Sequence, residues 1–394
     1  MWKRGRPRAL SHPPPPDHDS GLRQATAAHT NRRARDPRAK VVTTESPRLP
    51  RAAGAMSDAL LAQLRREPSY KLALPEPSAT DLLGDDDFQL ALYVLYELHY
   101  RGFADVTESW EWNPGLLGFR AELEQLFLEH LVGHVGPPSP GGEPAELDLH
   151  LRAVLDADDG PSLSRYVEIH ADLAQFREFV IHRSAYQLKE ADPHSWALPR
   201  LAGVAKAAMV EIQSDEYGEG ELDAMHSELF ATTMAELGLD PNYGAYLSRL
   251  PGSTLATVNL MSFFGLHRRW RGAIVGHLAA FEMSSSVPNR RYSNGLRRLG
   301  VGPTARRFYD VHVTADAVHE QVAAVDLAGG LARQDPAVVG DILFGARAVV
   351  ALDAAFAAYV LERWRAGESS LRADYSALSA SDSRPLSAEK PIVL

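Results

Sequence analysis

Residues 309–320 read Tyr309-Asp-Val-His-Val-Thr-Ala-Asp-Ala-Val-His-Glu320. Because an α-helix turns about 100° per residue, steps of four and three bring His312, Asp316 and His319 back to nearly one face. The residues between them are apolar or small, which predicts a helix buried on more than one side. Buried imidazole and carboxylate groups need partners. A transition metal is one such partner and ordinary hydrogen bonding is another, so the triplet by itself leaves both interpretations open.

The composition limits which metals and which function classes need to be considered. The chain has 394 residues, 45% of them hydrophobic, a net charge of −10 and no cysteine. Disulfides, thiolate zinc sites, cysteine-bound iron–sulfur clusters and cysteine nucleophiles are therefore excluded. A metal must be held by His, Asp and Glu, which suits iron, manganese or zinc. The negative charge argues against nucleic acid as a partner.

Hydrophobic segments give no sign of a membrane or secretory protein. No run of about 20 uncharged apolar residues is present, and the basic N-terminus is not followed by the apolar segment of a signal peptide. We therefore expect a cytoplasmic protein without membrane contact.

Helical periodicity dominates the chain from residue 85 onward, and alternation typical of strands is nearly absent. The longest helical stretches are expected at about 163–190, 195–217, 221–237, 254–286, 304–326 and from Asp335-Pro336 to near Trp364. Shorter ones are expected at about 85–102, 115–131 and 145–156. The predicted fold class is all-α, a bundle of roughly seven long helices with accessory N-terminal helices.

Composition also suggests domain boundaries. Residues 1–55 are rich in Arg and Pro and lack hydrophobic periodicity, which predicts a disordered basic extension. Met56 is the expected working start, and a chain that starts there is predicted to fold and bind metal like the full chain. Residues 56–144 are interpreted as an accessory helical region, 145–366 as the main bundle, and 367–394 as a flexible tail.

A second motif precedes the opening stretch. Asp223 and His226 are three residues apart, so on a helix they would share a face and could ligate one metal ion. A surface pair is the alternative. Gly218 and Gly220 each cost a helix about 1 kcal/mol, and together they predict a kink or a segment that melts readily.

Three further carboxylates are candidates for the same site. Glu282 lies in an apolar stretch, where a charge is costly unless it is paired. Glu190 and Glu216 could equally be solvated residues near helix ends.

Rival motifs are weaker. His130 and His134 have the spacing of a zinc protease helix but lack the Glu that would follow the first His, so that motif fails. His267 heads a basic stretch that is either a solvated face or a receiver for a substrate carboxylate; its other members are Arg268, Arg269 and Arg271. Motifs of nucleotide binding and serine hydrolysis are absent from the sequence.

Taken in order, these motifs resemble those of the haem-oxygenase-like diiron oxidases and oxygenases, and more narrowly the actinobacterial iron-containing redox enzymes. The motifs are Leu-Lys-Glu190, Asp-Glu216-Tyr-Gly-Glu-Gly, Asp223-x-x-His226, Glu282 and His312-x3-Asp316-x2-His319. The resemblance covers about residues 165–325. It implies that residues 145–366 form a haem-oxygenase-like bundle that binds two Fe(II) ions, not haem, and uses O2 as co-substrate.

The resemblance also implies a ligand set. Glu190 would supply a carboxylate from the first core helix, and Glu282 would bridge the two metals. The remaining implied ligands are Asp223, His226, His312, Asp316 and His319. Relatives often have Glu at the position of Asp223, whose side chain is one methylene shorter. Glu216 resembles an additional carboxylate ligand of the N-oxygenating members.

The expected function is that of a non-haem diiron oxidoreductase that uses O2 to oxidise a small amine, an amino-acid-derived substrate or a fatty-acid-like substrate. Glu216 slightly favours N-oxygenation over oxidative C–C cleavage or decarboxylation. Manganese is an alternative to iron because the ligands are hard. We expect a small-molecule substrate and an external electron donor, with a homodimer as an option. Two other classes stay open: a non-oxidative haem- or thiamine-related enzyme, and a helical binding protein with a degenerate metal site.

Overall fold

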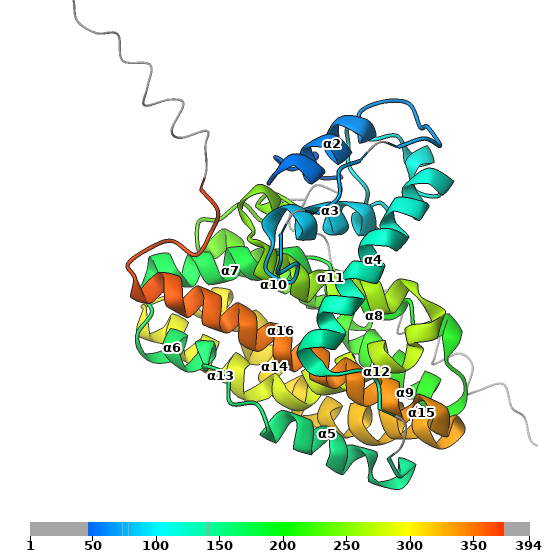
Figure 1. The fold of residues 1–394 in the computed structure, drawn as a ribbon. Coiled ribbons are helices and arrows are strands. Elements are labelled where there is room, and N and C mark those ends of the chain that lie inside the picture. The colour runs from blue at the N-terminus through cyan, green and yellow to red at the C-terminus, as the bar shows by residue number, and fades with distance from the viewer. Residues whose placement is uncertain (1–45, 73, 78, 140–141, 374–394) are drawn as a thin grey trace, which may run out of the picture. The chain divides into compact units, whose positions relative to one another are not determined.

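The structure is a computed structural model that describes residues 46–72, 74–77, 79–139 and 142–373; within α14 the side chains of 316–318 are not described. Throughout these ranges the regular secondary structure is helical and contains no strand (Figure 1). The predicted all-α fold class is therefore confirmed. The described residues fall within one compact unit, so the boundary predicted at residue 144 lies inside it.

The helices are as follows. The N-terminal part contains α2 (Ala55–Leu64), α3 (Asp86–Glu97), α4 (Pro114–Val135) and α5 (Leu147–Asp156). The middle contains α6 (Leu163–Ile169), α7 (Leu173–Gln187), α8 (Asp192–Ser195), α9 (Gly203–Glu216) and α10 (His226–Glu236). The last part contains α11 (Gly252–Leu266), α12 (Arg271–Ser284), α13 (Ser286–Arg298), α14 (Pro303–Gln321), α15 (Gly329–Gln334) and α16 (Val339–Arg365). A π-helix, η8 (Val322–Ala328), joins α14 to α15.

Some predicted helices are divided. The stretch 163–190 becomes α6 and α7 because Asp172 starts a new helix: its side chain accepts the backbone N–H of Gln175 at 2.8 Å. The stretch 254–286 becomes α11 and α12, separated by η7 (Arg268–Trp270). α13 lies where no helix was predicted, because its sequence is polar and contains Pro and Gly. It packs against α6 and α14, so tertiary contacts outweigh its weak propensity.

The N-terminal helices share one hydrophobic core with the rest of the chain. Leu60 of α2 and Phe88 of α3 belong to the same buried cluster as Phe263 of α11 and Val349 of α16. α3 packs directly on α11. The region predicted as accessory is thus part of the body of the domain.

α12 and α16 run side by side, and glycines bring them unusually close (Figure 1). A Cβ added at Gly276 would lie 1.8 Å from the carbonyl oxygen of Ile342, and one at Gly345 would lie 2.0 Å from the carbonyl oxygen of Ala273. Both distances are far below van der Waals contact, so only glycine fits at either position. The close packing fixes α12, and with it Glu282, against α16.

α16 and the turn before it, Pro336–Arg365, are long and apolar enough to cross a membrane by length and composition alone. Half of the most apolar window is buried inside the structure. Packing of α16 along α12 accounts for this composition, as for other core helices.

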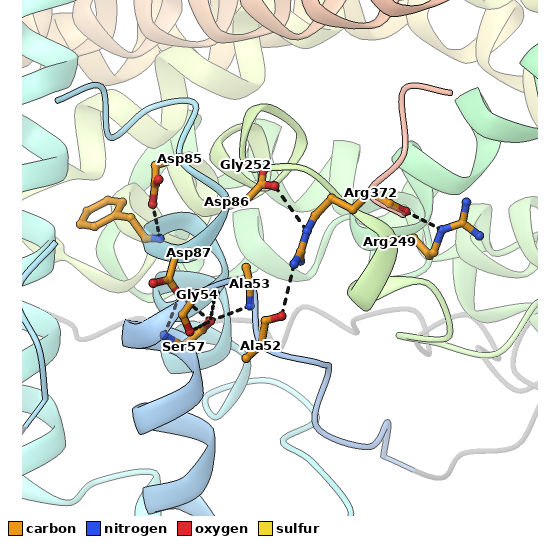
Figure 2. Close-up of polar contacts among 11 residues, drawn as sticks. Ala52, Ala53, Gly54, Ser57, Asp85, Asp86, Asp87, Arg249, Gly252 and Arg372 are labelled. Atoms are coloured by element: carbon orange, nitrogen blue, oxygen red, sulfur yellow. Dashed lines mark hydrogen bonds and ion pairs between the residues drawn. The ribbon is translucent and has the colours of Figure 1, made fainter. Parts of the chain in front are cut away.

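A set of contacts that we call the polar junction joins the two ends of the described chain; it consists of Ala52, Asp86, Arg249, Gly252 and Arg372 (Figure 2). The backbone N–H of Arg372 donates to the carbonyl of Arg249 at 2.9 Å, and its Nη2 donates to the carbonyl of Ala52 at 3.3 Å. Asp86 lies 3.3 Å from Nε of Arg372 and accepts the N–H of Gly252 at 2.6 Å. These contacts tie the first residues of α3 and α11 to the segment that contains Arg372.

Some residues inside the predicted N-terminal extension and C-terminal tail pack on the domain. The N–H of Leu49 donates to Asp105 at 2.9 Å, and the Leu49 side chain is buried. Ser370 and Leu371 are buried, and the N–H of Ser370 donates to Glu178 at 2.9 Å. Parts of the predicted extension and tail are therefore held on the domain by buried side chains and by hydrogen bonds to Asp105 and Glu178. The rest of both predictions, at 1–45 and 374–394, lies outside the described residues.

A chain that starts at Met56 is expected to be less stable than one that starts at Ser46. It loses the buried Leu49 side chain and the hydrogen bond to Asp105, together worth about 2–4 kcal/mol. Urea unfolding of the two truncated chains measures the difference. Coincident unfolding curves would instead support the composition-based boundary at residue 55.

Candidate metal centre

α14 carries His312 and His319, and both side chains are buried. Nδ1–H of His312 donates to the carbonyl of Phe308, one turn earlier, at 2.7 Å. This bond turns Nε2 toward Glu190, whose Oε1 lies 3.6 Å away. Metal-binding histidines are usually oriented by such a bond from the other ring nitrogen. The third member of the opening triplet, Asp316, has a side chain outside the described residues.

Glu190 follows the end of α7, in the tight turn that leads to α8. The next residue, Ala191, has a φ of 74°, a left-handed conformation that is unusual for any residue but glycine. The carbonyl of Ala191 accepts a hydrogen bond from Nε2 of Gln213 at 2.9 Å, which holds the turn. Backbone strain of this kind concentrates at functional sites. Oε2 of Glu190 is buried and has no hydrogen-bond partner among the described residues.

Glu216 and His226 face each other across a glycine-containing connection. Glu216 is the last residue of α9, His226 is the first of α10, and both are buried. Oε2 of Glu216 lies 2.8 Å from Nδ1 of His226. The ring of His226 also lies against that of His312, with centroids 4.3 Å apart.

The connection itself explains how the two side chains meet. Its first turn, η4 (Gly218–Gly220), has positive φ at all three residues, and a Cβ on Gly218 would lie 2.5 Å from the backbone of Ala224. The interruption predicted from the two glycines is confirmed. It folds the chain back so that the end of α9 and the start of α10 point at one place.

The structure does not bring Asp223 to this place. Asp223 lies in η5 (Leu222–Ala224), and its side chain is exposed. The predicted helix 221–237 begins only at His226, because the glycine turn occupies the preceding residues. A shared helix face for Asp223 and His226 therefore does not form, and Asp223 as a ligand stays a prediction from the resemblance.

His319 lies between two carboxylates. Its Nδ1 is 3.3 Å from Oε2 of Glu282 on α12, and its Nε2 is 3.1 Å from Oδ2 of Asp215 on α9. Asp215 was missed in the sequence. Its position next to Glu216 is the one feature of the sequence that could have indicated a role for Asp215, because the contact with His319 joins residues about a hundred positions apart.

The candidate ligands form two groups. The first group is Glu190, Glu216, His226 and His312, and the second group is Glu216, Glu282 and His319. Within each group, one ligand atom per residue can be chosen so that all lie within 4.8 Å of one another. Glu216 belongs to both groups. The resemblance implied that Glu282 would bridge; the described geometry gives the shared position to Glu216.

The electrostatics of the groups suit bound cations. Burial raises the pKa of Glu190 and that of Glu282, because a carboxylate without solvent or a cation is costly. Burial lowers the pKa of His319, but its hydrogen bond to Glu282 and the nearby carboxylates outweigh this and raise it to about 9. The three buried carboxylates that converge here, together with three buried imidazoles, are costly in their charged form unless cations balance them. Their nitrogen and oxygen donors fit Fe(II) or Mn(II).

A cavity of about 460 Å³ opens onto these groups. Glu190, Glu216, Glu282 and His312 line its inner part. Aromatic side chains cover much of the remaining wall, namely Phe179, Tyr186, Phe230, Phe281, Tyr292, Tyr309 and Phe356. The volume is in the range of small-molecule sites.

The rival motifs lie elsewhere. Nε2 of His267 contacts Glu124 at 2.8 Å, and Arg271 contacts Asp335 at 2.5 Å, so neither faces the cavity. His130 and His134 line a separate, shallow pocket on α4. Among the described residues, neither histidine belongs to a group of three or more converging ligands.

Comparisons with known proteins also point to a metal-binding role, as the geometry does. Residues 177–354 match the model of a family described as iron-containing redox enzymes. The chain is also 27% identical over 136 residues to a nitrosourea synthase of Streptomyces achromogenes subsp. streptozoticus. That alignment covers 34% of this chain and 29% of the relative, so the chain spans under a third of the relative's length. Residues 177–354 are thus similar to the iron-containing redox enzymes, and the all-α fold of the described residues agrees with the haem-oxygenase-like fold.

Proposed function

We propose that this protein is a non-haem diiron enzyme that uses O2 to oxidise a small organic substrate in the cavity, with N-oxygenation slightly favoured. The observation that carries the proposal is the pair of buried groups that share Glu216. The family match and the relative named as a nitrosourea synthase support an oxidative role.

In this proposal each group holds one iron. Glu190, His226 and His312 would hold the first, Glu282 and His319 the second, and Glu216 both. Three buried carboxylates offset much of the charge of two divalent ions, which makes their burial tolerable. When bound, the irons would supply the electrons and Lewis acidity that activate O2.

The chain's own residues would position the substrate and keep water out. The aromatic wall of the cavity gives a low-polarity path to the metal groups. The ring of Tyr186 stacks nearly parallel to that of Phe281, and the two ring centroids are 5.9 Å apart. Burial and the carboxylates of the two groups raise the pKa of Tyr186 well above its usual range. Its hydroxyl therefore stays protonated at neutral pH and can donate to a substrate.

We further propose that the protein is cytoplasmic and receives electrons from an external donor. Manganese is the alternative metal. A homodimer is the alternative to a monomer. Nucleic acid and membrane are not expected as partners.

Anaerobic Fe(II) titration, followed by removal of loose metal, tests the proposal. The wild type is expected to retain two irons per chain. His312→Ala and His319→Ala are each expected to lose one, because each histidine belongs to one group, whereas His134→Ala, on the surface of α4, serves as the control. Product analysis with ¹⁸O2 and a panel of amines, amino acids and fatty acids then identifies the reaction. Unchanged iron in both histidine variants would refute the assignment.

The connection between α9 and α10 is expected to become ordered on metal binding. Residues 218–226 contain two glycines and a non-glycine residue, Glu219, with a φ of 52°. The backbone hydrogen bonds donated by residues 220–225 are short-range turns within residues 217–225, and the Glu216–His226 contact joins the two ends of the segment. Amide hydrogen exchange in this segment is expected to slow at least 10-fold with Fe(II), a gain of about 1.4 kcal/mol in local stability. The α12–α16 contact serves as the internal reference. Equal exchange with and without metal would contradict the expectation.

A further inference from the structure

One wall of the cavity carries an ion pair that belongs to neither metal group. Arg183 of α7 and Asp353 of α16 both line the cavity, and Nη1 of Arg183 lies 3.3 Å from Oδ1 of Asp353. About a fifth of the Arg183 side chain and a third of the Asp353 side chain remain accessible, 21% and 32%. Both charges are therefore partly desolvated but still open to a ligand.

Aromatic rings hold the guanidinium in place. Cζ of Arg183 lies 4.7 Å from the ring centroid of Phe356 and 5.8 Å from that of Phe179. Such cation–π contacts fix the plane of the group. The hydrogen bond to Asp353 uses one of five N–H donors, and the planar fork of arginine matches the two oxygens of a carboxylate.

The ion pair lies at a useful distance from the metal groups. Arg183 and Glu190 are seven residues apart on α7 and the turn that follows it, and both line the cavity. Seven residues correspond to two helical turns, or about 10 Å. A ligand with its polar head at Arg183 and Asp353 would present its other end to the candidate ligands.

We propose that Arg183 and Asp353 form the head-group subsite of the cavity and bind the carboxylate and the ammonium of a zwitterionic α-amino acid. Two opposite charges side by side match a zwitterion. A fatty acid would place its carboxylate beside Asp353, and a simple amine would place its ammonium beside Arg183, and like charges at such distances are disfavoured. The inference names the substrate class of the proposed enzyme and to that extent rests on the proposed function.

The test is ligand binding, which does not require turnover. The common L-amino acids, with the amine and the carboxylic acid that match each, are titrated into the full chain by calorimetry, both without metal and with Mn(II). At least one amino acid is expected to bind, and to bind about 10-fold or more tightly than either matched compound. Absence of amino acid binding to the wild type, or equal binding of the acid alone, would overturn the subsite.

Substitutions then assign the two contacts. Arg183→Met is expected to weaken binding of the amino acid and of the acid, but not of the amine. Asp353→Asn is expected to weaken the amino acid and the amine, but not the acid. Arg291→Met is the matched control, because Arg291 also lines the cavity but contacts Ser162 and Ser164, at 3.2 Å each. Arg183→Lys, which keeps the charge, covers the case in which the Met variant fails to fold.

The iron titration separates this inference from the proposed function. Binding that depends on Arg183 and Asp353, in a protein that retains no iron, would keep the subsite and refute the diiron enzyme. Two retained irons, together with variants that bind like the wild type, would refute only the subsite.

Discussion

Replacing Glu216 with alanine is expected to remove both irons at once. Among the side chains that the structure describes, Glu216 alone belongs to both groups of converging ligands, whereas each histidine belongs to one. Loss of a partner that only orients a ligand already costs a metal site about 10- to 100-fold in affinity, so loss of a shared ligand is expected to cost more than about 100-fold at each site. Iron content after anaerobic loading and desalting measures the effect.

Glu211→Ala is the matched control for this variant. Glu211 lies on the same helix, α9, and its side chain is exposed, so its removal is expected to leave iron binding unchanged. Retention of one iron by Glu216→Ala would show that the carboxylate serves one metal only. The bridging role would then return to Glu282, as the family resemblance implied.

Replacing Lys189 with methionine is expected to lower the free energy of unfolding by about 3–5 kcal/mol, the usual cost of breaking a buried ion pair. Nζ of Lys189 lies 2.9 Å from Oε2 of Glu97, and the two side chains are 1% and 0% exposed. Tyr243 donates to the same carboxylate oxygen at 2.6 Å, and the Tyr100 ring lies 4.3 Å from Nζ. Without the ammonium, Glu97 would remain buried as an uncompensated charge. Urea unfolding measures the loss.

The double variant Lys189→Met/Glu97→Leu distinguishes charge from packing. Replacing both partners of a buried pair with apolar residues is often neutral, so the double variant is expected to recover most of the stability. If it were no more stable than Lys189→Met, the loss would come from packing. Because Lys189 precedes Glu190, the single variant is also expected to weaken iron binding at the first group, which the control variant Glu211→Ala does not.

Local patterns in the sequence predicted what depends on local structure. The spacing of His312 and His319 placed both imidazoles on the buried face of one helix, because helical geometry alone determines that relation. The glycines at 218 and 220 likewise predicted the interruption after α9, because positive φ is a property of the residue itself. The capping pattern of Asp172 and Gln175 likewise marks a helix start inside the stretch 163–190, because a cap depends on neighbouring residues only.

Relations between distant residues could not be predicted in this way. Asp215 reaches His319, and Glu97 reaches Lys189 from 92 residues earlier, and spacing along the chain contains no trace of either contact. The roles of Glu216 and Glu282 depend on where α9 and α12 meet α14, which is also a matter of tertiary packing. Asp223 was predicted to share a helix face with His226. The chain forms no α-helix at Asp223, so the three-residue spacing does not bring the two side chains together.

The polar junction has a consequence for the order in which the protein is made. The hydrogen bond from Arg372 to Ala52 joins residues 320 positions apart, and Arg372 also contacts Asp86 at the start of α3. Contacts of such long sequence separation form late and slow down folding. α2 and α3 are synthesised well before Arg372, so this contact can form only after residue 372 has left the ribosome. A nascent chain therefore lacks this anchor of α2 and α3 until residue 372 has been synthesised.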